Sequence, residues 1–113
     1  MNLRGVDLNL LVVLDALLEE AHVSRAAERL GLSQPATSSA LDRCRHLFGD
    51  RLLERAAGSM RLTPKAEALR PRLKDALAGV VDVLAPPEVP LADLRQTVRL
   101  LMADNLAALL LGR

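Results

Sequence analysis

The most informative part of the chain is SRAAERLGLSQPA, residues 24–36. Ser24 can accept a hydrogen bond as the N-cap of a short helix over residues 25–30, and two adjacent alanines in that helix allow close packing. Gly31 follows at a position where helices commonly end in a left-handed residue. The first half of this stretch therefore predicts a short helix that ends in a tight glycine turn.

A further helix follows the turn at once. Ser33 can cap it, and Pro35 lies in its first turn, where a missing N–H costs nothing. Two helices joined by a glycine turn, with small residues where they cross, are typical of a helix-turn-helix. The sequence therefore predicts that motif.

Upstream lies a strongly apolar segment. Asp7 can cap a helix that runs to about Ala21. Its apolar side chains cover nearly the whole circumference, as expected of a helix buried on more than one side. In so small a protein, we expect one of these sides to face a partner chain. The apolar residues are Leu8, Leu10, Leu11, Val12, Val13, Leu14, Leu17 and Leu18.

Two short extended segments follow Gly49. Residues 51–55 and 60–62 are separated by the small residues 56–59. Brief strands around a small-residue turn predict a β-hairpin. Next to a helix-turn-helix, such a hairpin is the wing of a winged helix-turn-helix.

A long helix is predicted after the hairpin. Thr63 and Pro64 begin it as N-cap and first residue, Pro71 is expected to kink it, and two prolines, 86–87, end it. Apolar residues recur at alternating three- and four-residue steps, which favours a two-helix coiled coil. These residues are Ala66, Leu69, Leu73, Ala76, Val80 and Val83, with Leu77 and Leu84 beside them. We expect a homodimer through Leu69, Leu73, Leu77, Val80 and Leu84.

The fold class expected is mainly α: three helices and a hairpin wing, followed by a long dimerisation helix. Residues 1–63 form the predicted DNA-binding domain, 64–85 the linker helix, and 86–113 a hinge with the start of a further domain. Within that last part, residues 88–95 indicate the hinge, 97–102 a buried strand and 105–111 the beginning of a helix.

Charge is unevenly distributed along the 113 residues. The formal net charge is only +1, yet residues 43–74 carry nine Lys or Arg against three Asp or Glu. A neutral chain with one basic region suits a directed contact with a polyanion. Phe48 is the only aromatic residue, which argues against RNA or single-strand binding, because a stacking platform needs several aromatic side chains.

The sequence gives no support for a disulfide-bonded or metal-binding protein, an enzyme, or a secreted or membrane protein. Cys44 cannot form an internal disulfide, and with His22 and His46 it lacks the spacing of a metal site. We interpret Cys44 as a packing residue and the two histidines as loop and helix-surface residues. No nucleophile motif or phosphate loop is present, so we expect neither an enzyme nor a cofactor. No signal peptide or membrane span is predicted, and we expect a soluble protein of the cytoplasm, associated with the nucleoid.

Four segments together resemble the LysR-type transcriptional regulators. Residues 24–36 resemble the family's helix-turn-helix, and residues 60–69 its junction of wing and linker. Residues 5–11 and 48–53 are similar to the nodulation-regulator branch. The resemblance implies a dimeric regulator of double-stranded DNA that is truncated before the family's effector-binding domain. On this interpretation residues 86–113 hold a hinge and the truncated start of that sensing domain. A small-molecule effector is expected only in a full-length form, and without the sensing domain we expect no tetramer.

The candidate DNA contacts follow from the position of the predicted recognition helix, whose first residues lie nearest the base edges of the major groove. Gln34 can pair with adenine, and Pro35 can touch a thymine methyl group. The arginines can neutralise phosphates. Ser33 is included, although a capping role alone is the preferred interpretation. The candidates are Ser24, Arg25, Ser33, Gln34, Pro35, Thr37, Ser38, Asp42, Arg43, Arg45, Arg55 and Arg61.

A second hypothesis is an interaction protein that pairs with full-length relatives and antagonises them. Many family members carry a basic residue at the position of Ser39 and an arginine at that of Gly58. Their absence weakens the predicted DNA contacts and keeps this alternative open. The leading hypothesis remains a dimer that binds an interrupted palindrome through the major groove.

Overall fold

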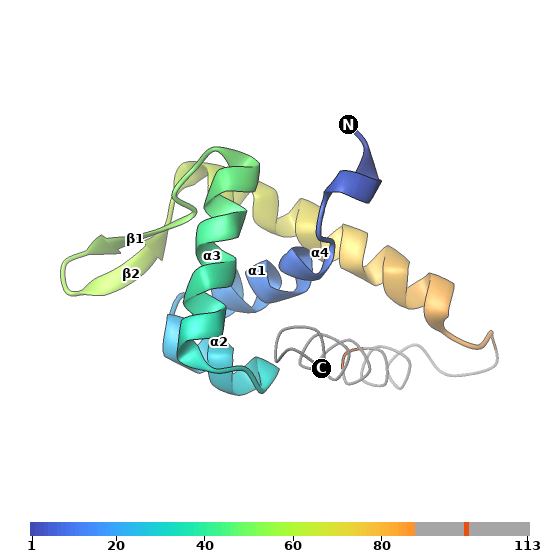
Figure 1. Ribbon diagram of the computed structural model, residues 1–113, viewed down its shortest axis with the longest axis horizontal. Helices are drawn as coiled ribbons and strands as arrows, with labels where there is room; N and C mark the ends of the chain where they lie inside the picture. Colours follow the sequence, from blue (N-terminus) through green and yellow to red (C-terminus); the bar gives the residue numbers. More distant parts are fainter. Residues whose placement is uncertain (88–98, 100–113) are drawn as a thin grey trace.

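The computed structural model describes residues 1–87 and Arg99 (Figure 1). This described part is mainly helical with one antiparallel hairpin, so the expected winged helix-turn-helix architecture is confirmed. The predicted hinge and final helix lie outside the described residues. Of the predicted buried strand, residues 97–102, only Arg99 is described, and it is exposed and helical, so the prediction is wrong at that residue. The elements in chain order are η1 (Leu3–Gly5), α1 (Asn9–Glu20), α2 (Val23–Leu30), α3 (Gln34–Phe48), β1 (Leu53–Ala56), β2 (Ser59–Leu62) and α4 (Pro64–Leu84).

Helix α1 lies at the centre and packs against α2, α3 and α4. Contact with three helices explains why its apolar residues surround it, since six of its twelve residues are buried. Leu14 and Leu17 are fully enclosed, while Leu11 and Val12 are half-buried against the same core. The helices of this chain therefore bury most of α1, and a partner chain is not needed to explain its composition.

The first two helices begin differently from the prediction. The side chain that caps α2 belongs to His22, whose Nδ1 accepts a hydrogen bond from the N–H of Arg25 at 3.1 Å. Ser24 is instead the second residue of the helix, so the prediction that it is the cap was wrong. Asp7 lies one residue before the N-cap Leu8 of α1, and its Oδ1 accepts from the N–H of Asn9 at 3.1 Å.

The glycine turn and the helix after it form as predicted. Gly31 ends α2 with φ +69°, a left-handed conformation that glycine adopts without steric cost. Ser33 caps α3 through a hydrogen bond of 3.2 Å from the N–H of Ala36, and Pro35 lies in the first turn. The helix-turn-helix is thus fixed largely by local interactions.

The hairpin has a tighter turn than predicted. Its register pairs Leu53 with Leu62 at the base and Ala56 with Ser59 at the tip, so only Ala57 and Gly58 form the turn. Both have positive φ, 49° and 83°. That combination is the type I′ turn, whose twist matches a two-residue hairpin. The wing projects from the helical body on the side away from the far end of α4 (Figure 1).

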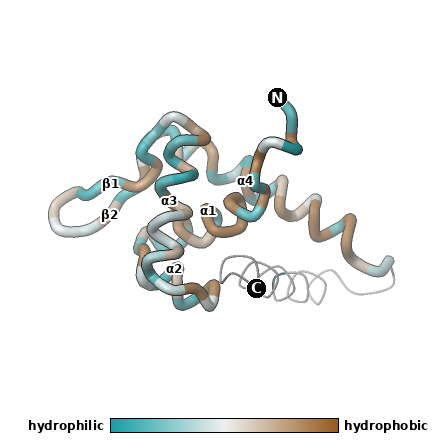
Figure 2. The backbone as a smooth tube through the Cα atoms, viewed as in Figure 1, coloured by the Kyte–Doolittle hydropathy of each residue, from teal (hydrophilic) through white to brown (hydrophobic). Residues whose placement is uncertain are grey.

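Helix α4 begins as predicted at the cap Thr63 and continues without a break through Pro71. Its apolar positions divide into two groups. Ala66 and Leu73 are buried, and Leu69 and Leu77 pack half-buried on the same core. The exposed group, Val80, Val83 and Leu84, lies in the distal part, where Figure 2 shows hydrophobic residues along the end of α4. The inclusion of Leu73 in the dimer contact needs correction, because only 4% of it is exposed.

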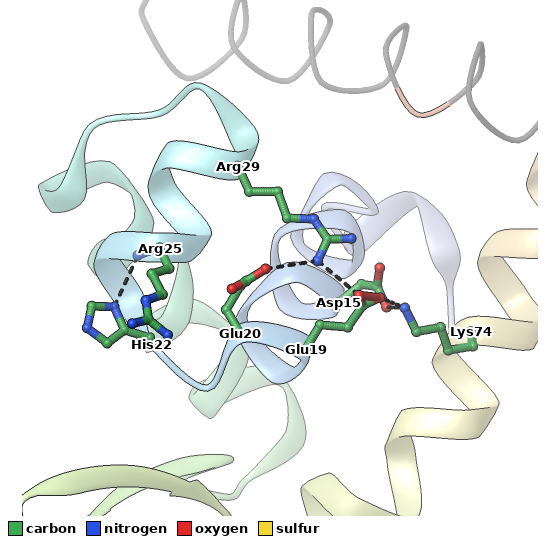
Figure 3. A network of polar contacts seen from close by, with 7 residues as sticks. All are labelled: Asp15, Glu19, Glu20, His22, Arg25, Arg29 and Lys74. Carbon is green, nitrogen blue, oxygen red and sulfur yellow. Dashed lines mark hydrogen bonds and ion pairs between the residues drawn. The ribbon is translucent and has the colours of Figure 1, made fainter.

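Ion pairs join α4 to the helix-turn-helix (Figure 3). Lys74 pairs with Asp15 at 3.0 Å and also with Glu19, both on α1. Arg29 of α2 pairs with Glu19 at 2.9 Å and with Glu20 at 3.4 Å. One network of alternating charges therefore links three helices and helps to set the direction in which α4 leaves the domain. Among the residues described, no helix is both long and apolar enough to cross a membrane.

Candidate nucleic-acid interface

The N-terminal end of α3 is open to solvent. Gln34 and Pro35 are exposed there, and Ser38 is half-exposed one turn further on. The hydroxyl of Ser33 accepts the N–H of Ala36 as the cap of α3, and Gln34, Pro35 and Ser38 present further polar and apolar groups at this end. A helix end presented in this way can enter the major groove with Gln34 leading.

Thr37 does not belong to this surface, although it was among the candidate contacts. It is completely buried, and its Oγ1 donates to the carbonyl oxygen of Ser33 at 2.9 Å. The side chain turns back along its own helix, as threonine commonly does, instead of facing outward. The prediction for Thr37 was therefore wrong.

The basic side chains of α3 have different surroundings. Arg43 is about half exposed (51% of its side chain), and its Nη2 lies 3.1 Å from Oδ2 of Asp7. An exposed ion pair of this kind is weak, so a phosphate can compete for the guanidinium. Asp42 is also exposed, and its Oδ1 lies 3.1 Å from Nη1 of Arg45.

Arg45 is occupied within the protein. Its Nε donates to the carbonyl oxygen of Arg51 and its Nη2 to that of Leu53, both at 2.8 Å. With the contact to Asp42, each nitrogen of its guanidinium has a partner, and only 21% of the side chain is exposed. The expectation that Arg45 reaches a phosphate needs correction, because the side chain holds the base of the wing.

The two wing arginines are exposed but do not share a face of the hairpin. The register places Arg61 opposite Glu54 and Arg55 opposite Met60. Successive residues of a strand point to opposite faces, so Arg55 and Arg61 lie on opposite sides. The Nε of Arg61 lies 3.7 Å from Oε2 of Glu54. A duplex approached by one face of the wing thus meets one of these arginines first.

The beginning of α2 presents a smaller basic group. Arg25 is exposed and Ser24 is half-exposed, while the ring of His22 caps the helix. Reasoning from sequence missed His22, because serine, threonine, aspartate and asparagine are the usual caps. The sequence did offer one indication: His22 lies three residues before Arg25, which is the spacing between a capping side chain and the N–H that it accepts.

Cys44 behaves as a packing residue. It is fully buried, and its Sγ donates to the carbonyl oxygen of Leu10 at 3.6 Å. Burial raises the pKa of the Cys44 thiol from 9.0 to about 12. The group therefore stays protonated and unreactive near neutral pH, in agreement with the interpretation from sequence. His46 lies exposed on the surface of α3, as predicted.

A comparison with family models gives a match over most of the described residues. The model described as "Bacterial regulatory helix-turn-helix protein, lysR family" matches residues 8–67, which run from the start of α1 into α4. The chain belongs to the lysR family. The resemblance inferred from sequence motifs is thereby confirmed.

Curated relatives within the lysR family include nodulation regulators. The chain is 40% identical to Nodulation protein D 1 of Rhizobium meliloti (strain 1021), an alignment covering 100% of this chain and 37% of that protein. It is 42% identical to HTH-type transcriptional regulator SyrM 2 of Sinorhizobium fredii (strain NBRC 101917 / NGR234), covering 97% and 32%. The chain thus spans about a third of the length of these two lysR-family relatives.

Solved structures of similar fold include a probable transcriptional regulator and two protein–DNA complexes. The probable transcriptional regulator PA0477 from Pseudomonas aeruginosa matches with a TM-score of 0.68 at 40% identity, over 78% of this chain and 30% of that one. The BenM_DBD/catB site 1 DNA complex matches with a TM-score of 0.65 at 25% identity, over 70% and 89%. The CbnR_DBD–DNA complex matches with a TM-score of 0.58 at 26% identity, over 64% and 83%.

Proposed function

We propose that this chain is a sequence-specific transcription regulator of LysR type that binds double-stranded DNA. The observation that carries the proposal is the exposed N-terminal end of α3, where Gln34 and Pro35 lead a helix held in place by Gly31 and Ser33. Likeness to two DNA complexes of comparable fold supports it. The chain acts by binding and carries out no catalysis.

The contacts divide by chemistry. Gln34 reads an adenine edge through its amide, and Pro35 lies against a thymine methyl group. Ser38 and Asp42 follow along the same helix. Phosphate contacts come from Ser24 and Arg25 at the start of α2, from Arg43, and from Arg55 and Arg61 on the wing; they provide affinity that does not depend on sequence.

Binding takes place as a homodimer on an interrupted palindrome. Val80, Val83 and Leu84 form an exposed apolar end of α4, to which the half-buried Leu69 and Leu77 add. Burying this surface against a second copy removes apolar area from water. Two copies related by a twofold axis then present two α3 helices to two half-sites.

The setting of this activity is the bacterial cytoplasm, at the nucleoid. A small-molecule effector acts only on a longer form that carries a sensing domain, and no cofactor takes part. This part of the proposal concerns a full-length form, because the chain spans about a third of the length of these curated relatives.

Fluorescence anisotropy of the 113-residue chain tests the proposal. The duplexes are interrupted palindromes with T in one half-site and A in the other, compared with scrambled duplexes at several salt concentrations. We expect selective binding whose affinity falls steeply with salt, because phosphate contacts release counterions. Weak binding without selectivity would contradict the proposal. It would favour a chain that dimerises with full-length relatives and antagonises them, an alternative that the exposed end of α4 also allows.

A further inference from the structure

The base of the wing, residues 50–53, contains an unusual turn. The N–H of Leu53 donates to the carbonyl oxygen of Arg51 at 2.7 Å, which closes a three-residue γ-turn around Leu52. Leu52 has φ +65° and is fully buried. The γ-turn with positive φ at its central residue is the rarer and strained form, which leucine adopts only where neighbouring groups hold it.

Neighbouring side chains satisfy the backbone groups of this turn. Oδ2 of Asp50 accepts from the N–H of Leu52 at 2.9 Å and from the hydroxyl of Thr63 at 2.6 Å. The N–H of Thr63 donates in turn to the carbonyl oxygen of Leu52 at 3.0 Å. The start of α4 is therefore bonded directly to the wing base.

Arg45 completes the arrangement from α3. Its guanidinium bridges the turn, with Nε on the carbonyl oxygen of Arg51 and Nη2 on that of Leu53. Arginine suits this task because its planar group presents several donors in a fixed geometry. A strained turn persists only where its surroundings over-determine it, and here side chains from α3 and the start of α4 do so.

The wing depends on this attachment for its direction. An isolated two-stranded hairpin is at best marginally stable in water, and beyond the buried Leu53 no residue of the two strands is fully buried. Arg45 and Gln34 belong to the same helix. The bonds of Arg45 therefore hold β1, which carries Arg55, in a fixed orientation relative to α3, whose N-terminal end carries Gln34.

We propose that Arg45 is a positioning residue that locks the wing to α3, so that Gln34 and Arg55 reach one duplex at the same time. It acts through the wing base and is not itself a phosphate ligand. The inference rests on the proposed DNA binding and adds to it the device that couples the two contact surfaces.

A double-mutant cycle on DNA affinity separates this role from direct contact. The substitutions are Arg45→Met, Arg55→Ala and Gln34→Ala, alone and in pairs. We expect Arg55→Ala to weaken binding roughly tenfold in the native background but less than about threefold when Arg45→Met is present, because a loosened wing no longer holds Arg55 in place. The effect of Gln34→Ala should be the same in both backgrounds. Additivity of Arg45→Met with Arg55→Ala would overturn the proposal.

A matched control uses Arg43→Met on the same helix. Arg43 makes no bond to the wing base, so its effect should add to that of Arg55→Ala. Arg45→Lys serves if the methionine variant folds poorly. A lysine provides one charge centre in place of the guanidinium fork, and we expect it to retain part of the coupling.

Amide hydrogen exchange without DNA provides a readout that does not depend on the proposed function. Arg45→Met should speed exchange at the N–H groups of Leu52 and Leu53 at least tenfold more than at Leu17 in the core of α1. Equal acceleration at all three positions would mean general destabilisation and would refute a local lock. If the unsubstituted chain shows no affinity for DNA, the proposed function fails. Hydrogen exchange alone then tests whether Arg45 holds the wing base.

Discussion

The hydroxyl of Thr63 lies 2.6 Å from Oδ2 of Asp50 and donates to it, while the same hydroxyl caps α4 by accepting from the N–H of Ala66 at 3.1 Å. The hydrogen bond from Thr63 is the main reason why the pKa of Asp50 lies below its ordinary value of 3.8. The bond from the N–H of Leu52 and the charge of Lys65 lower this pKa further. One carboxylate therefore secures both the wing base and the start of α4.

A pH dependence follows, because a lowered pKa in the folded state stabilises the protein above the unfolded pKa. This contribution is lost as pH falls through the folded value. We expect Asp50→Asn to be less stable than the native chain near pH 7, with the difference shrinking below about pH 4. Urea denaturation across this range measures it. Asp82→Asn, exposed near the end of α4, is the control, and a difference of constant size down to pH 2 would contradict the assignment.

Thr37→Val should affect stability and leave DNA binding alone. The hydroxyl is buried and bonded to the carbonyl oxygen of Ser33, which also accepts the N–H of Thr37. The carbonyl group keeps one partner, so we expect a loss of about 1 kcal/mol in the free energy of unfolding. Anisotropy with the interrupted palindrome that binds the native chain most tightly should show unchanged affinity. A tenfold weaker complex in a folded variant would restore Thr37 to the DNA surface.

Cys44 should be inert toward thiol reagents in the folded chain. Its pKa of about 12 leaves almost no thiolate near pH 8, and the sulfur is fully buried. Labelling with a chromogenic disulfide should proceed only as fast as the chain unfolds, and at once in urea. Ser39→Cys, on the exposed side of the same helix, should react promptly in the native state. Rapid native labelling of Cys44 would argue for an accessible, activated thiol.

His22→Ala should destabilise the chain by removing the side-chain cap of α2. The lost bond is that from the N–H of Arg25 to Nδ1, and losing a cap typically costs about 1 kcal/mol. His22→Ser offers a hydroxyl at the same position and should recover most of the stability. Thermal denaturation of the three chains compares them. Equal stability of the alanine and serine variants would show that the cap bond contributes little.

Val83→Asp should separate the proposed dimer without unfolding its subunits. Val83 is 83% exposed, so a charge there is tolerated by the monomer within about 0.5 kcal/mol. Sedimentation equilibrium should show a clear shift toward monomer, together with a loss of affinity for palindromes but less for single half-sites. Asp82→Ser is the adjacent control. An unchanged association constant would place the dimer contact elsewhere.

The sequence by itself determined the elements whose signals are local. Gly31, Ser33 and the Thr63-Pro64 pair act on backbone groups within about four residues, so the ends of α2, α3 and α4 could be placed from the chain alone. Hydrophobic periodicity likewise predicted the long helix, and apolar residues around the whole circumference predicted the buried α1. The ordered motifs indicated the family, and with it the helix that we propose to read DNA.

Only the tertiary structure decided which side chains remain free to act. Arg43 and Arg45 look equivalent in the sequence, but one meets Asp7 from 36 residues away and the other closes on the wing base. The heptad pattern gives Leu73 and Val83 the same role, but Leu73 is buried in the core of its own chain and Val83 is exposed. The left-handed φ of Leu52 could not be predicted from the sequence, because only the bond to Asp50, two residues before it, is local. The bond from Thr63 and the bonds of Arg45 to the neighbouring carbonyl oxygens come from α3 and the start of α4. Local propensity sets the elements, whereas the partner of a charged or apolar side chain depends on which distant element packs beside it.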